Sequence, residues 1–98
     1  MFIVSLTYIA SLEEVDKHLA EHVKYLENQY ELENFIASGR KVPRTGGIIL
    51  SKLNSLEELE AILEKDPFKK ANLATYDIVE FIPSMTSKEF ENLQEKIV

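Results

Sequence analysis

The stretch FIVSLTYIASLEEVDKHLAEHVKYLENQYE, residues 2–31, decides the fold of this chain. Its first part, Phe2 to Ile9, is mostly apolar and uncharged, which is typical of a largely buried strand. Ser11 stands three residues before Glu14, and this Ser-x-x-Glu capping box predicts that a helix begins here. Apolar residues then recur at spacings of three and four, in one stripe that ends near Glu31: Leu12, Val15, Leu19, Val23, Leu26 and Tyr30. We therefore expect a central strand and an amphipathic helix that covers a sheet.

The rest of the chain gives similar signals. Residues 34–38 and 47–53 are apolar segments joined by a stretch rich in Gly and Pro, which predicts two antiparallel strands and a loop. A second capping box, Ser55 to Glu58, predicts a helix that ends near Lys65. Thr75 to Pro83 predicts a last strand. A short terminal helix is expected after it, capped by Thr86 and Glu89 and bearing Phe90, Leu93 and Ile97.

The predicted order is strand, helix, strand, strand, helix, strand, with an added C-terminal helix. This order is typical of an α+β, ferredoxin-like βαββαβ fold, and we expect one domain over residues 1–98. Both main helices should cover one face of the sheet. The other face would then expose apolar strand residues, such as Ile3, Phe35, Ile49 and Val79. Because so large an apolar patch is unusual on a monomer, we expect a homodimer joined through its sheets.

Composition excludes several classes of function. A formal net charge of −6 argues against nucleic acid, whose phosphates favour concentrated Lys and Arg. No apolar run approaches the ~20 residues of a membrane span, and no basic leader is present, so we expect a cytoplasmic protein without a membrane partner. The absence of cysteine excludes disulfides, thiolate nucleophiles and Cys-ligated zinc. Any chemistry must therefore use His, carboxylates, hydroxyls or cations.

His22 and Asp66 are the candidate proton-transfer pair. His22 falls at the margin of the apolar stripe, beside Val15, where an imidazole could meet both a pocket and the interior. Asp66 precedes Pro67, as residues that cap a new helical turn do. A carboxylate bonded to one ring nitrogen would fix the tautomer of His22, with Phe68 as a nearby apolar wall. The alternatives are a helix-edge histidine that merely bonds a neighbour and an aspartate that only caps.

Further polar residues are candidates for binding. No acid occurs between Glu33 and Glu57, and Arg40 and Arg44 in that interval predict a positive potential that could hold a small anion. The alternative is a solvated basic hairpin. At a strand end, Ser38 and Gly39 could let a substrate approach backbone amides, although ordinary hairpin chemistry explains them equally well.

Two weaker candidates remain. The spacing of His18 and His22 suits a metal, but no third ligand follows, so we expect no metal and no other cofactor. Tyr8, Tyr25 and Tyr76 are either proton donors or core residues, and the sequence favours none of them for a role in the site.

Several motifs occur together in one order along the chain: His22-Val23-Lys24-Tyr25-Leu26, Ser38-Gly39, Gly46-Gly47-Ile48-Ile49, Ser55-Leu56-Glu57-Glu58, Asp66-Pro67-Phe68 and Tyr76-Asp77-Ile78-Val79-Glu80-Phe81. This combination resembles the YciI-like (YCII-related) family. The resemblance implies a dimeric α+β barrel whose pocket is lined by a His and an Asp, here His22 and Asp66. It also implies isomerisation or elimination chemistry, as in a lyase or isomerase. Arg40 and Asn72 depart from the family pattern, which leaves the substrate undefined.

The sequence thus favours a small enzyme that uses His22 and Asp66 for general acid/base chemistry on a small polar or anionic organic compound. Its expected partners are that small molecule and a second copy of the chain. The alternative is a non-catalytic dimer that binds or senses a small ligand in the same pocket.

Overall fold

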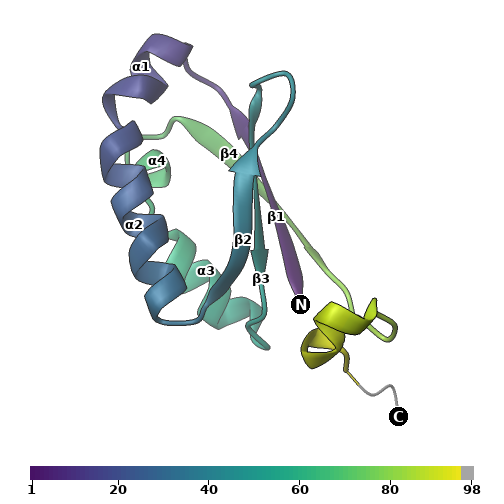
Figure 1. Cartoon of the computed structure of the whole chain (residues 1–98). Helices are drawn as coiled ribbons and strands as arrows, with labels where there is room; N and C mark the ends of the chain where they lie inside the picture. The colour runs from purple at the N-terminus through teal and green to yellow at the C-terminus, as the bar shows by residue number, and fades with distance from the viewer. Residues whose placement is uncertain (96–98) are drawn as a thin grey trace.

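The computed structural model describes residues 1–95 and shows a mixed α+β architecture (Figure 1). The elements in chain order are β1 (Phe2–Tyr8), α1 (Leu12–Lys17), α2 (Leu19–Glu31), β2 (Phe35–Arg40), β3 (Gly46–Ser51), α3 (Leu56–Leu63), α4 (Pro67–Lys70), β4 (Ala74–Glu80) and the 3-10 helix η1 (Lys88–Leu93). The four strands form one antiparallel sheet in the order β2-β3-β1-β4. The α-helices lie on one side of this sheet (Figure 1).

The central strand β1 anchors the core. It pairs with β3 on one side and with β4 on the other. Phe2, Val4 and Leu6 are buried, while the residues between them point to the opposite face. This alternation follows from the pleat of a strand, in which successive side chains point to opposite sides. The helix-covered face of the sheet is therefore the main core.

Two of the four residues predicted on the open face of the sheet lie on the helix-covered face instead. Phe35 and Ile49, predicted on the open face, are only 3% and 2% exposed and belong to the core under the helices. The register explains this, because Ile49 lies opposite the buried Val4. Ile3 and Val79 pair with each other on the opposite face, as predicted, and Val79 is 57% exposed. Periodicity alone could not assign these faces, because a shift of one residue moves every side chain of a strand to the other side.

The first predicted helix is divided at His18 into α1 and α2. The buried side of α2 also differs from the predicted apolar stripe, because it consists of His22, Tyr25 and Gln29. Each has a partner: His22 bonds Asp66, the Tyr25 hydroxyl donates to the Ile62 carbonyl at 2.8 Å, and Gln29 accepts from Asn34 at 2.8 Å. Polar groups with such partners can be buried without a large desolvation penalty.

Single residues determine where α1, α3 and β3 begin. The side chains of Ser11 and Ser55 accept hydrogen bonds from the backbone N–H of Glu14 and Glu58, both at 3.2 Å. Gly46 begins β3 so close to β1 that a Cβ there would lie 1.7 Å from the carbonyl oxygen of Leu6. A glycine is therefore required at this position for the strands to pair.

The C-terminal part differs in detail from the prediction. The last strand ends at Glu80 rather than at Pro83, and the helix after it is the 3-10 helix η1, preceded by Ser87. Phe90 and Leu93 lie in η1, whereas Ile97 is outside the described residues. Within residues 1–95, no helix is long and apolar enough to cross a bilayer.

Candidate functional site

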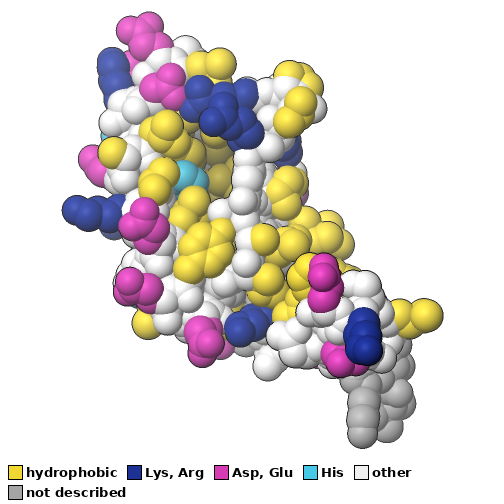
Figure 2. Space-filling model, viewed as in Figure 1, with side chains coloured by type: hydrophobic (Ala, Val, Ile, Leu, Met, Phe, Trp, Pro, Cys, Tyr) yellow, Lys and Arg dark blue, Asp and Glu magenta, His cyan; other side chains and the backbone are white. Residues whose placement is uncertain are grey.

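A cavity of about 240 Å³ opens between α2 and the sheet. Figure 2 shows a histidine in this hollow, next to hydrophobic side chains and below a group of Lys and Arg side chains. The lining residues come from α2, three strands, the β2–β3 loop and α4: Leu6, Tyr8, Leu19, His22, Val23, Leu26, Ser38, Gly39, Arg40, Arg44, Gly47, Ile48, Ile49 and Phe68. Since drug-sized ligands occupy roughly 300–1,000 Å³, this cavity suits a smaller compound.

The cavity explains the exposed part of the apolar stripe on α2. Leu19 and Val23 are 39% and 43% exposed, and both line the cavity together with Leu26. Part of the apolar stripe, which periodicity predicts to be core, therefore forms a wall of the cavity. An apolar wall of this kind is typical of small-molecule sites.

His22 and Asp66 are in direct contact. His22 Nδ1 lies 2.7 Å from Asp66 Oδ1, although the two residues are 44 positions apart. Asp66 is completely buried, at 0% exposure, and also caps α4 by accepting the Phe68 N–H at 3.0 Å. Because an ionised carboxylate only accepts hydrogen bonds, this geometry places the Nδ1 proton on His22.

The other ring nitrogen of His22 is available to the cavity. Among the described residues, Nε2 has no hydrogen-bond partner and does not belong to the buried unpartnered atoms. The imidazole is stacked on Phe68, with ring centroids 3.8 Å apart and an angle of 5° between the planes. Asp66 and Phe68 thus fix both the tautomer and the orientation of the ring. His22 itself is 9% exposed, so it is more deeply buried than its predicted position at the margin of a helix face.

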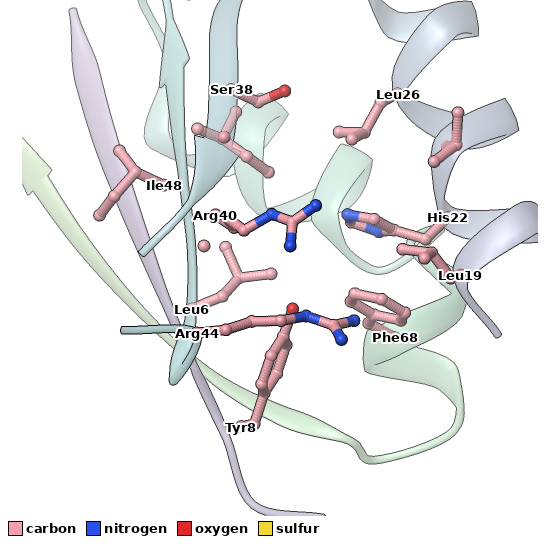
Figure 3. Close-up of a pocket in the computed structure, with 14 residues that line it drawn as sticks. Leu6, Tyr8, Leu19, His22, Leu26, Ser38, Arg40, Arg44, Ile48 and Phe68 are labelled. Atoms are coloured by element: carbon pink, nitrogen blue, oxygen red, sulfur yellow. The ribbon is translucent and has the colours of Figure 1, made fainter. Parts of the chain in front are cut away.

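Two arginines supply positive charge. Arg40 and Arg44 both line the cavity, and Figure 3 shows the Arg40 guanidinium pointing across it toward His22. Arg44 also donates to Asp16 of α1 at 2.5 Å. This hydrogen bond holds the pKa of the exposed Asp16 carboxyl below its usual range. Arg44 is therefore partly neutralised by Asp16, whereas Arg40 has no ion pair within residues 1–95.

Ser38 and Gly39 lie at the edge of the cavity, on β2. The Ser38 hydroxyl is hydrogen-bonded to the Tyr30 hydroxyl. A Cβ at Gly39 would meet no atom within 4 Å, so the fold itself does not require glycine there. The structure thus brings together all of the predicted site residues, with Asp66 behind His22 rather than in the cavity lining.

Sequence reasoning left out part of the site. Tyr8 lines the cavity from the end of β1, and Tyr76 donates its hydroxyl proton to Asp66 Oδ2 at 2.7 Å. Both were candidates among the tyrosines, but no local signal distinguishes a tyrosine in a site from one in the core. For His18 and His22, the described residues provide no cluster of three or more His, Asp or Glu side chains that could hold a metal.

Comparison with known proteins identifies the family of this chain. No curated protein matches the chain. Among solved structures, it is similar to a 5-chloro-2-hydroxyhydroquinone dehydrochlorinase from Burkholderia phenoliruptrix AC1100, in complex with 2,5-dihydroxybenzoquinone. The identity is 22% and the TM-score 0.69, over 83% of this chain and 93% of that chain, which shows a shared fold. The model of the YCII-related domain matches residues 1–82. The family expected from the sequence motifs is thereby confirmed, and the chain belongs to the YCII-related domain family.

Proposed function

We propose that this protein is an enzyme in which His22, oriented by Asp66, acts as a general acid or base on a small polar or anionic organic compound. The observation that carries this proposal is the bond from His22 Nδ1 to a completely buried carboxylate, with Nε2 left for the cavity. An imidazole titrates near neutral pH, and a fixed tautomer keeps one nitrogen ready to accept a proton.

The cavity lining supports either isomerisation or elimination. In both, neutral Nε2 would accept a proton from a carbon of the substrate. In an elimination, the electron pair of that C–H bond forms a double bond while a leaving group departs from the neighbouring atom with its own electron pair. In an isomerisation, the imidazolium returns the proton at another position. Asp66 would stabilise the imidazolium in either case, because it bonds the opposite nitrogen.

The other residues would bind and orient the compound. Arg40 and Arg44 would hold its anionic group, as guanidinium groups hold carboxylates and other planar anions. Phe68 and the leucines of α2 would exclude water from the reacting atoms, and Ser38 and Gly39 would contact the substrate at the rim. The similar solved structure is named as a dehydrochlorinase, which acts by elimination, and this supports the same reaction class here.

We also propose that the protein works in the cytoplasm as a homodimer with a ferredoxin-like fold, in the form of a dimeric α+β barrel. The sheet order β2-β3-β1-β4 supports that arrangement. The sheet face opposite the helices bears Ile3 and Val79, which a second sheet would cover. Light scattering at micromolar concentration should give the mass of a dimer, and a monomeric mass would contradict this assembly.

The catalytic proposal is tested by substituting His22 while keeping its contact with Asp66. His22→Asn suits this purpose because its amide nitrogen takes about the place of Nδ1 and can still donate to Asp66. His18→Ala is the matched control, because His18 lies one turn earlier and does not line the cavity. A panel of small carboxylates and phenolates would first be screened for binding by thermal shift, and each compound that binds would then be assayed for turnover.

We expect His22→Asn to slow turnover by about 10²–10⁴-fold, as the loss of a general acid or base does, and His18→Ala to have no effect. Arg40→Ala should weaken binding of the same anion, whereas Lys52→Ala, outside the cavity lining, should not. Equal turnover by wild type and His22→Asn would reject the catalytic role. Binding without turnover by the wild type would favour the alternative, a dimer that binds or senses a small ligand.

A further inference from the structure

The Asp66 carboxylate has a third hydrogen-bond partner on its buried side. Oδ1 accepts from His22 Nδ1 at 2.7 Å and from the Phe68 N–H at 3.0 Å, whereas within residues 1–95 Oδ2 accepts only from the Tyr76 hydroxyl, at 2.7 Å. The two oxygens therefore have different surroundings. We propose that Tyr76 is a positioning residue, which holds the Asp66 carboxylate in the rotation that aligns Oδ1 with His22. This inference rests on the proposed function of His22.

The position of Tyr76 in the fold allows this role. Tyr76 lies on β4 opposite the buried Leu6, so its side chain points to the helix-covered face of the sheet, where Asp66 caps α4. The Nζ atom of Lys69 lies 5.2 Å from the centre of the Tyr76 ring. Burial, together with the charge and hydrogen bond of Asp66, raises the pKa of the Tyr76 hydroxyl. Tyr76 therefore stays protonated at neutral pH and can donate only its single O–H proton to Asp66.

Tyr76→Phe would remove the hydroxyl that donates to Oδ2, an oxygen of the completely buried Asp66 carboxylate. Leaving a buried charged acceptor unpaired is unfavourable, so the carboxylate would rotate to share the remaining donors. Both of those donors, His22 Nδ1 and the Phe68 N–H, now bond Oδ1. Rotation would therefore disturb the Nδ1 bond, and with it the fixed tautomer of His22.

Tyr25 provides a matched control. Its ring also lies near His22, at 6.3 Å between centroids, and burial also raises the pKa of its hydroxyl. The Tyr25 hydroxyl, however, donates to the backbone carbonyl of Ile62 rather than to Asp66. Tyr25→Phe thus removes the same atom from a similarly buried tyrosine without changing the partners of the carboxylate.

The experiment compares Tyr76→Phe with Tyr25→Phe and needs no substrate. Nitrogen-15 NMR of the histidine rings reports the tautomer of His22 and the rate at which its Nδ1 proton exchanges with water. We expect this exchange to be about tenfold or more faster in Tyr76→Phe, since a hydrogen bond to a charged group shifts an equilibrium by at least that factor. Tyr25→Phe should keep the wild-type signals. Unchanged His22 signals in folded Tyr76→Phe would overturn the proposal.

A second variant tests the same link if Tyr76→Phe does not fold. Asp66→Asn keeps an acceptor for the Phe68 N–H and so preserves the cap of α4. In Asp66→Asn, the hydroxyl proton of Tyr76 and the Nδ1 proton of His22 should both shift, because both bond the same carboxylate in the wild type. A Tyr76 hydroxyl signal that does not respond would overturn the proposal.

The outcomes separate this inference from the proposed function. Altered His22 signals in Tyr76→Phe support the positioning role even if the wild type turns over no compound. Loss of turnover in His22→Asn, with unaltered ring signals in Tyr76→Phe, overturns the positioning role and leaves the proposed function intact. For a compound that is turned over, Tyr76→Phe should lower kcat by about tenfold or more with little change in KM, since Tyr76 does not line the cavity.

Discussion

Replacement of Asp66 by alanine tests how much the buried carboxylate contributes to the fold. Asp66 accepts hydrogen bonds from His22, the Phe68 N–H and Tyr76, and it is completely buried. Asp66→Ala removes the acceptor and leaves all three donors in place. The variant therefore measures the loss of a helix cap together with the loss of two side-chain partners.

The magnitude follows from these contacts. Loss of an aspartate cap destabilises a helix start by about 1 kcal/mol. Each of the two side-chain donors loses a hydrogen bond to a charged group, with a net value of about 1.5–3 kcal/mol. Part of this is recovered, because the proton of His22 can move to Nε2 at the cavity. We therefore expect Asp66→Ala to lower the free energy of unfolding by about 3–5 kcal/mol, as for removal of one partner of a buried pair.

Urea unfolding followed by circular dichroism measures this difference, with all variants at one protein concentration because the proposed dimer would gain stability with concentration. Asp66→Asn keeps an acceptor for the cap and should lose less stability than Asp66→Ala. Asp16→Ala is the surface control, because the exposed Asp16 carboxylate bonds the Arg44 side chain at the surface, at 2.5 Å, and the unfolding midpoint of this variant should barely change. If Asp66→Ala unfolds within about 1 kcal/mol of the wild type, the hydrogen bonds assigned to Asp66 do not stabilise the protein in solution.

Four further variants probe the packing of His22, two glycines and two buried tyrosines. His22→Ala should lose about 2–5 kcal/mol in urea unfolding, because it leaves a cavity and a buried carboxylate with one donor fewer, and stability equal to wild type would contradict this packing. Gly46→Ala should destabilise by about 1–3 kcal/mol or more, since the new Cβ would clash with a carbonyl of β1, while Gly39→Ala, which has open space, should melt like the wild type. Burial raises the pKa values of Tyr25 and Tyr76, so the folded state keeps protons that the unfolded state releases above about pH 10. The contribution of these two tyrosines to stability should therefore be constant below that pH and fall above it, and a Tyr25→Phe/Tyr76→Phe double variant should lose less stability above about pH 10 in thermal unfolding.

Local sequence signals predicted the elements well where one residue acts on its near neighbours. The serine caps of α1 and α3 and the Asp66 cap of α4 depend on bonds over two or three positions. The family, too, was evident from the order of short motifs, and the match over residues 1–82 confirms it. Such features follow from the sequence because the interacting groups are held close together by the chain itself.

Tertiary structure decided which faces are buried and which residues meet. Periodicity predicted that Leu19 and Val23 cover the sheet, yet they line the cavity, while His22 is buried through its bond to Asp66. The two residues of the proposed proton-transfer pair were evident from the sequence, but their contact across 44 positions was not, and neither was the hydrogen bond of Tyr76 to Asp66. The physical reason is that hydrophobic periodicity indicates only which side chains of a helix or strand face away from bulk water. Whether that interior is core or cavity, and which distant polar group shares it, depends on the packing of α2 and α4 against the sheet.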